Sequence, residues 1–179
     1  MGEKKQRPNY FVVPNVTVEV VAYVDVSKPD AVRVLSETEE KKLPTKDDVK
    51  DGVIDHTKLP ETTLVEWSKW VKPSWGIHAW IEEQSWSRKS ADPRLGKEFD
   101  LVRYTRARVR ALMVDWSLST DDKSKALVRV PEHASDGTPV QILSTPSMTL
   151  LSDCMPALMN VFYNKAMDVL YPTEEEVKN

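Results

Sequence analysis

The chain has 179 residues, of which 40% are hydrophobic and 30% charged, and its formal net charge is −3. This balance favours one globular domain with solvated appendages, and it excludes a global attraction to nucleic acid or anionic lipid. A single cysteine, Cys154, excludes an internal disulfide and a zinc site built from several cysteines. No apolar run is long enough to span a bilayer, and the N-terminus "MGEKKQRPNYFVV" lacks the features of a secretion signal.

The first part of the chain predicts strands. β-branched residues dominate residues 10–35, and Val16, Val18 and Val20 alternate with polar residues, as in a half-buried strand. The "SKPD" stretch at 27–30 separates two such runs and predicts a turn. We therefore expect residues 1–36 to form a small N-terminal antiparallel β-sheet.

Residues 37–63 have a different composition. The stretch contains few apolar residues, two prolines and many charges of both signs. Such a segment buries too little apolar surface to offset the entropy lost on ordering. We expect a charged, flexible linker here.

Residues 64–179 are expected to form a mainly α-helical domain. Leu64, Trp67 and Val71 have helical spacing and precede Pro73, which predicts one helix, and "SWGIHAWIEEQSW" predicts a second short helix. The clearest expected helix covers 97–118. Its predicted apolar stripe consists of Phe99, Val102, Val109, Leu112, Met113 and Trp116.

The remainder of that domain alternates polar and apolar stretches. A strand is expected at 126–130 and a turn at "SDGTP", residues 135–139. Thr145 before Pro146 predicts a helix start, and a longer helix is expected over about 153–171, with an acidic tail behind it. The predicted fold class is therefore α+β, with a small N-terminal antiparallel β-sheet followed by a mainly α-helical domain.

Five of the six tryptophans lie between residues 67 and 86. Their helical spacing and the break at Pro73 favour a packing role in a helical core over a flat ligand platform. Trp75 and Trp86 lie nearest the expected helix breaks. These two are the tryptophans most suited to exposure and to contact with a partner.

Signatures of catalysis and metal binding are missing from the sequence. The three histidines lie in separate segments without the pair spacing of a zinc helix, and no GxSxG, GxxxxGK[ST] or GxGxxG motif occurs. Cys154 has apolar neighbours, which favours a buried structural thiol over a reactive one. We expect no enzyme activity, no cofactor and no metal.

A basic segment spans residues 88–110, with eight basic against three acidic residues. Arg103, Arg106 and Arg110 share one face of the expected helix. Such a face suits an acidic protein partner, and we take these arginines as candidate partner-binding residues together with Trp75 and Trp86. An alternative is a nucleic-acid-binding regulator, in which the arginines hold phosphates and the indoles stack on bases.

The second half of the chain carries an ordered series of short motifs. They are Trp116-Ser117-Leu118 at a helix end, Asp136-Gly137-Thr138-Pro139-Val140, Thr145 to Leu151, and the last helix with its charged tail. Over roughly residues 97–179 this series resembles the tail assembly chaperones of long-tailed bacteriophages. About a dozen extra residues, "DKSKALVRVPEHAS", separate the first two motifs.

The resemblance implies a non-enzymatic chaperone in the host cytoplasm that binds the tape measure protein and recruits tail tube subunits. Self-association of the chain stays open. A second possibility is a virion structural protein, such as a neck, tail-completion or minor tail component. The nucleic-acid-binding regulator is the third possibility.

Overall fold

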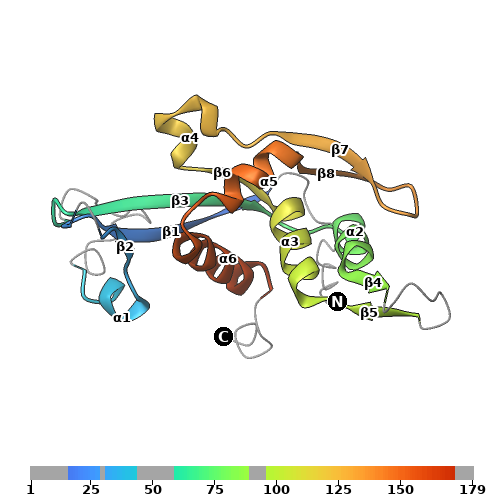
Figure 1. The fold of residues 1–179 in the computed structure, drawn as a ribbon, viewed down its shortest axis with the longest axis horizontal. Helices are drawn as coiled ribbons and strands as arrows, with labels where there is room; N and C mark the ends of the chain where they lie inside the picture. The colour runs from blue at the N-terminus through green and yellow to red at the C-terminus, as the bar shows by residue number, and fades with distance from the viewer. Residues whose placement is uncertain (1–15, 29–30, 44–58, 89–95, 172–179) are drawn as a thin grey trace, which may run out of the picture.

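The computed structural model describes residues 16–28, 31–43, 59–88 and 96–171. An antiparallel sheet of four strands, in the order β2-β1-β3-β6, lies against helices, so the fold is α+β as predicted (Figure 1). The part of the predicted N-terminal sheet before residue 16, most of the expected linker and the acidic tail lie outside the described residues. No helix in the described part of the chain is long and apolar enough to cross a membrane.

The sheet is built on one long antiparallel pair. Strand β1 (Thr17–Asp25) pairs with β3 (Thr63–Val71) over nine residues, and the short β2 (Arg33–Val34) pairs with the end of β1. The prediction for β1 is confirmed, because Val20, Ala22 and Val24 are buried on one face. A four-residue helix, α1 (Glu37–Glu40), follows β2 inside the expected linker.

The predicted helix over residues 64–71 is wrong, since these residues form β3. Leu64, Trp67 and Val71 imitate a helical spacing only because both faces of the strand carry apolar residues. On the buried face the strand has Ser68 and Trp70, and the serine interrupts the apolar alternation that marks a strand. Ser68 accepts a hydrogen bond of 2.8 Å from the indole of Trp70, so both polar atoms are satisfied.

The long helix predicted over 97–118 is correct only in its middle, as α3 (Leu101–Leu112). Residues 97–99 form β5 (Lys97–Phe99), which pairs with β4 (Trp86–Arg88). Met113 has extended backbone angles, φ −71° and ψ 136°, and begins β6 (Met113–Trp116) beside β3. The predicted apolar stripe therefore spans three elements, and its members Phe99 and Val102 are exposed.

Helix α3 packs through small residues instead. Ala107 and Ala111 are buried, and they allow α3 to lie close to α2 (Trp75–Ser85), the short helix predicted after Pro73. Ser74 caps α2 by accepting a hydrogen bond of 3.4 Å from the Ile77 backbone.

A hairpin and three helices complete the fold. Strands β7 (Arg129–His133) and β8 (Pro139–Leu143) pair across the predicted turn, where Gly137 adopts a φ of 83°. The short helix α4 (Leu118–Asp121) lies between β6 and this hairpin. Helix α5 (Thr145–Ser152) follows the hairpin, and its cap is Ser144, one residue earlier than predicted.

The last helix, α6 (Pro156–Leu170), lies across one face of β1 and β3 (Figure 1). Phe162 and Ala166 of α6 are fully buried in one core with residues of the sheet. Trp70 meets Tyr163 of α6 edge-on, with 6.4 Å between ring centroids.

The six tryptophans differ in burial, and Trp67 on β3 is partly buried. Trp70, Trp80 and Trp116 are buried in the core, although Trp70 and Trp116 lie on strands and not on the predicted helices. Trp75 and Trp86 are exposed, as their positions near helix ends suggested.

Candidate functional site

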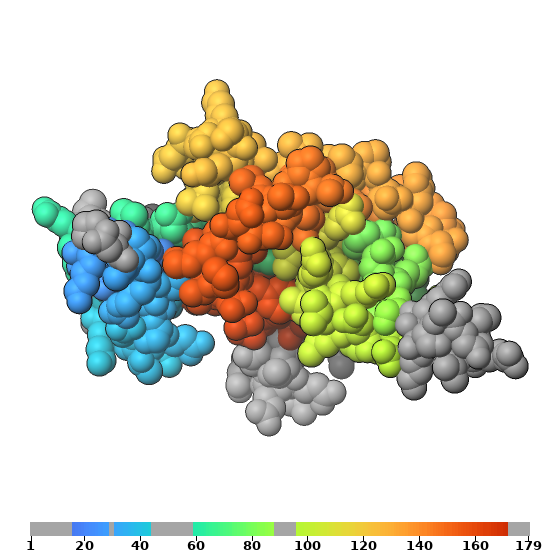
Figure 2. All heavy atoms as spheres, in the orientation of Figure 1, coloured from blue at the N-terminus to red at the C-terminus, as the bar shows by residue number. Residues whose placement is uncertain are grey.

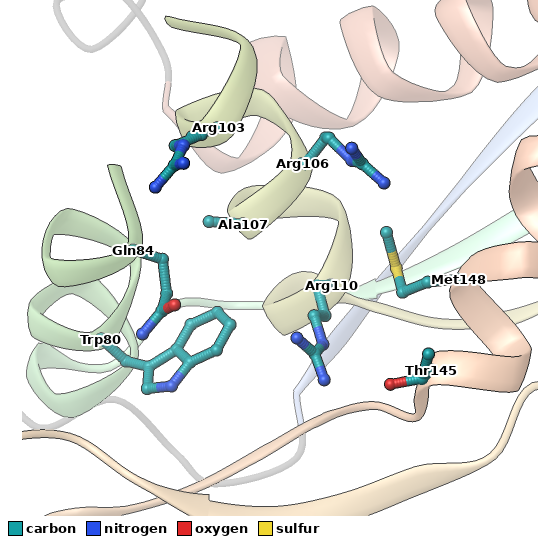
Figure 3. A pocket seen from close by; sticks show the side chains of 8 residues that line it. All are labelled: Trp80, Gln84, Arg103, Arg106, Ala107, Arg110, Thr145 and Met148. Atoms are coloured by element: carbon teal, nitrogen blue, oxygen red, sulfur yellow. The ribbon is translucent and has the colours of Figure 1, made fainter. Parts of the chain in front are cut away.

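The three predicted arginines line one pocket of about 310 Å³ between α2, α3 and α5 (Figure 3). The fold therefore brings the candidate arginines together around a concave surface. The residues that line the pocket are Trp80, Gln84, Arg103, Arg106, Ala107, Arg110, Thr145 and Met148.

Helix α3 supplies one side of the pocket through its own periodicity. Arg103, Arg106 and Arg110 are spaced by three and four residues, so they lie along one stripe, and buried Ala107 lies beside them. The helix starts at a defined residue, because Asp100 accepts hydrogen bonds of 3.0 Å from the backbone of Val102 and of Arg103. This cap fixes the register that places the arginines.

The facing walls come from distant segments. Trp80 and Gln84 lie one turn apart on α2, and Thr145 and Met148 lie one turn apart on α5. None of these four residues was predicted to line a site, because only the tertiary fold brings α2 and α5 to the two sides of α3.

The pocket is strongly positive. No lining residue in the described part of the chain is acidic, so three guanidinium groups share the space without a carboxylate among them. Arg103 has a carboxylate nearby, with 3.5 Å between its Nε and Oδ2 of Asp100. Among the described residues, neither Arg106 nor Arg110 forms an ion pair with an acidic side chain. A bound anion would therefore reduce the repulsion among the three groups.

One arginine is held in place by the backbone. Arg110 donates from Nε to the carbonyl oxygen of Leu143 at 3.0 Å, and this bond leaves its terminal nitrogens to face the pocket. A guanidinium group anchored through Nε still presents two parallel N–H donors, which match the two oxygens of a carboxylate. The pocket is thus suited to bind acidic side chains.

The neighbouring Arg108 has a structural position away from the pocket. Its guanidinium lies 4.1 Å from the ring centroid of Tyr104 and 4.5 Å from that of Tyr171, and it contacts the sulfur of Met167 at 3.7 Å. Burial raises the pKa of Tyr171 to about 12. Burial and the Arg108 charge lower the pKa of His78, which packs edge-on against Tyr171. The contacts of Arg108 with Tyr171 and Met167 therefore join α3 to α6 and the residue that follows it.

The two candidate tryptophans do not line this pocket. Trp75 is 82% exposed at the first residue of α2, and Trp86 is 45% exposed where α2 ends. Trp86 lines a separate hollow with Glu82, Glu83 and Lys97. The structure thus groups the three arginines with each other and places both tryptophans outside their pocket.

The described residues that could bind a metal or act as a nucleophile do not form a second site. Within the described residues, no three His, Cys, Asp or Glu side chains are grouped as metal ligands. Cys154 is half-buried, and burial raises the pKa of its thiol.

The fold and the pocket define a small α+β protein with an anion-attracting site between three helices. No protein-family model, curated protein or solved structure matches the chain.

Proposed function

We propose that the protein is a non-enzymatic binding protein whose arginine pocket holds acidic side chains of a protein partner. The observation that carries this proposal is the grouping of Arg103, Arg106 and Arg110 around one concave space without an acidic lining residue. Carboxylates of a partner would form charge-assisted, bidentate hydrogen bonds there.

The resemblance of residues 97–179 to tail assembly chaperones supports a specific role for such binding. In this role the protein is a host-cytoplasmic chaperone of bacteriophage tail assembly. Its partners are the tape measure protein, a long helical chain, and tail tube subunits. The pocket would recognise the acidic side chains of such a partner before the tail is complete.

Co-expression tests this role. The chain is produced with the tape measure protein encoded in the same phage genome, and copurification is measured. We expect the wild-type protein to retain the partner and the double variant Arg103→Glu/Arg106→Glu to lose it. The double variant Lys72→Glu/Lys123→Glu changes the net charge equally at two exposed positions outside the pocket, so it should still copurify. Equal retention by both double variants would reject the pocket as the binding site.

The virion alternative is separated by the composition of finished particles. A chaperone leaves before maturation, so its absence from purified particles by mass spectrometry is the expected result. Its presence in stoichiometric amounts would instead assign the chain to the neck or tail structure.

The exposure of Trp75 favours the nucleic-acid alternative as the second candidate. An exposed indole can stack on a base, and such binding quenches tryptophan fluorescence and weakens with salt. A titration with single-stranded oligonucleotides at low salt decides this point. We expect no quenching, and quenching that salt reverses would favour the regulator.

A further inference from the structure

An apolar surface of four exposed residues lies at the start of α3. We define it as Trp86, Phe99, Leu101 and Val102, of which Leu101 is 68% and Val102 69% exposed. These are four of the ten exposed large hydrophobic residues in the described part of the chain. Trp86 pairs with Phe99 across β4 and β5, and Leu101 and Val102 follow Phe99 closely in the chain. Single exposed apolar residues are ordinary on a protein surface, whereas a group of them marks an interaction site.

The apolar surface has a fixed geometry. Trp86 and Phe99 are paired across β4 and β5 and meet edge-on, with 5.7 Å between ring centroids. Phe99 also packs on Tyr104 at 5.2 Å, and Tyr104 is stacked on Arg108. Since these rings are already held by neighbours, a partner that binds them loses little additional side-chain entropy.

The apolar surface continues into the arginine pocket along one helix. Val102 lies one turn from Arg106 on the exposed side of α3, and Arg103 is the next residue in the chain. From Leu101 to Arg110 the helix rises about 14 Å. Figure 2 shows α3 and β5, in yellow-green, at the surface of this face of the molecule. One partner segment of two to three helical turns would cover both regions.

We infer that the apolar surface and the arginine pocket together bind a single amphipathic helix of a protein partner, with apolar residues at one end and acidic residues at the other. This inference rests on the proposed function and names the chemistry of its partner. The charge of the pocket requires the acidic end, and Leu101 and Val102 require the apolar end. Asp100 caps α3 and contacts Arg103, so part of its charge is offset by that arginine.

The test uses designed peptides of about 20 residues, long enough to form an isolated helix. The first peptide has leucines on one face of one half and glutamates on the same face of the other half. It is made in both chain directions. The second has lysines in place of the glutamates, and the third is a scramble of the first. Each is labelled with a fluorophore and titrated with the full chain by fluorescence anisotropy.

We expect the acidic amphipathic peptide, in one of its two directions, to bind at least about tenfold more tightly than the lysine peptide and the scramble. Leu101→Ser/Val102→Ser should weaken this binding about tenfold, and Arg106→Glu should weaken it as much. Val169→Ser is the matched control, because Val169 is 53% exposed on α6 and outside both regions. Melting curves verify that each variant is folded.

The outcomes separate this inference from the proposed function. If the scramble binds as well as the designed peptide, charge alone accounts for binding and the helix inference is overturned. If Arg106→Glu weakens binding and Leu101→Ser/Val102→Ser does not, the peptide binds the arginine pocket without the apolar surface. That result supports the proposed function and overturns this inference. If an oligonucleotide binds more tightly than every peptide, both proposals fall. If the peptide binds but the tape measure protein does not copurify, the combined binding of the apolar surface and the arginine pocket is supported and the phage partner is rejected.

Discussion

Arg110 donates a 3.0 Å hydrogen bond from Nε to the carbonyl oxygen of Leu143, the last residue of β8. Arg129 of β7 donates in the opposite direction, from a terminal nitrogen to the carbonyl oxygen of Ala111 on α3 at 2.7 Å. Burial lowers the pKa of Arg129. Two arginine–carbonyl bonds thus join α3 to the β7–β8 hairpin. They hold the helix that carries the pocket against the hairpin that leads into α5.

Arg110→Met is expected to lower the free energy of unfolding by about 1 kcal/mol, because the Leu143 carbonyl loses its charged donor. Arg106→Met is the matched control, since Arg106 is exposed and lines the same pocket, and it should stay within about 0.5 kcal/mol of the wild type. Urea unfolding monitored by circular dichroism measures both. Equal effects would mean that the Arg110 bond adds nothing to stability.

Gly76 lies in α2 against the side chain of Thr138 at the β7–β8 turn. A Cβ at position 76 would lie 2.4 Å from Cγ2 of Thr138. Gly76→Ala should therefore destabilise the protein by about 1–3 kcal/mol, although alanine alone favours a helix. Adding Thr138→Ser removes the clashing methyl group and should restore most of the loss. Thermal melts of the single and double variants measure this coupling, and an unchanged melting temperature for Gly76→Ala contradicts the close approach.

Trp75 and Trp80 on α2 have opposite environments. Trp80→Ala should cost about 3–5 kcal/mol of unfolding free energy, because the indole is buried and its loss leaves a cavity. Trp75→Ala should change stability by less than about 0.5 kcal/mol, since the side chain is exposed. Denaturant unfolding of both variants tests this difference, and a comparable loss for the two would show that Trp75 has a packing role.

We expect Glu39 of α1 to make a pH-dependent contribution to the stability of the fold. Hydrogen bonds from the backbone and hydroxyl of Ser36, together with the Arg33 guanidinium, lower the pKa of Glu39 from 4.5 to about 2. A carboxyl whose pKa is lower in the folded state adds stability above its unfolded pKa, and this stability disappears as pH falls through the folded value. The melting temperature of Glu39→Gln should lie below that of the wild type at neutral pH. The difference should close between pH 4.5 and about 2, and a constant difference over that range would contradict the assignment.

Strand β1 was predictable, because Val18 and Val20 alternate with Thr17 and Glu19 and β-branched residues continue along the strand. The arginine stripe was predictable for a similar reason, since residues 103, 106 and 110 keep helical spacing inside a true helix. Local periodicity was sufficient in both cases.

Strand β3 and the ends of α3 were not predictable from periodicity. Ser68 occupies a buried position of β3 that an apolar residue normally fills, and its polar group is satisfied by Trp70 only in the folded sheet. No glycine or proline near Met113 marks the end of α3 in the sequence. The helix ends there because β6 pairs with β3. The walls of the pocket depend on the packing of α2 and α5 against α3, so Gln84 and Met148 were not predicted to line a site.

Lys165 on α6 donates from Nζ to the carbonyl oxygen of Val21 in β1 at 2.7 Å and forms an ion pair with Glu40. These partners are separated by 144 and 125 positions along the chain. During synthesis β1 leaves the ribosome first, and at ordinary translation rates about ten seconds pass before α6 follows. The apolar face of β1 stays uncovered for that time. The nascent chain therefore completes its core only after the last helix has emerged, and its folding is expected to be slow and sensitive to aggregation.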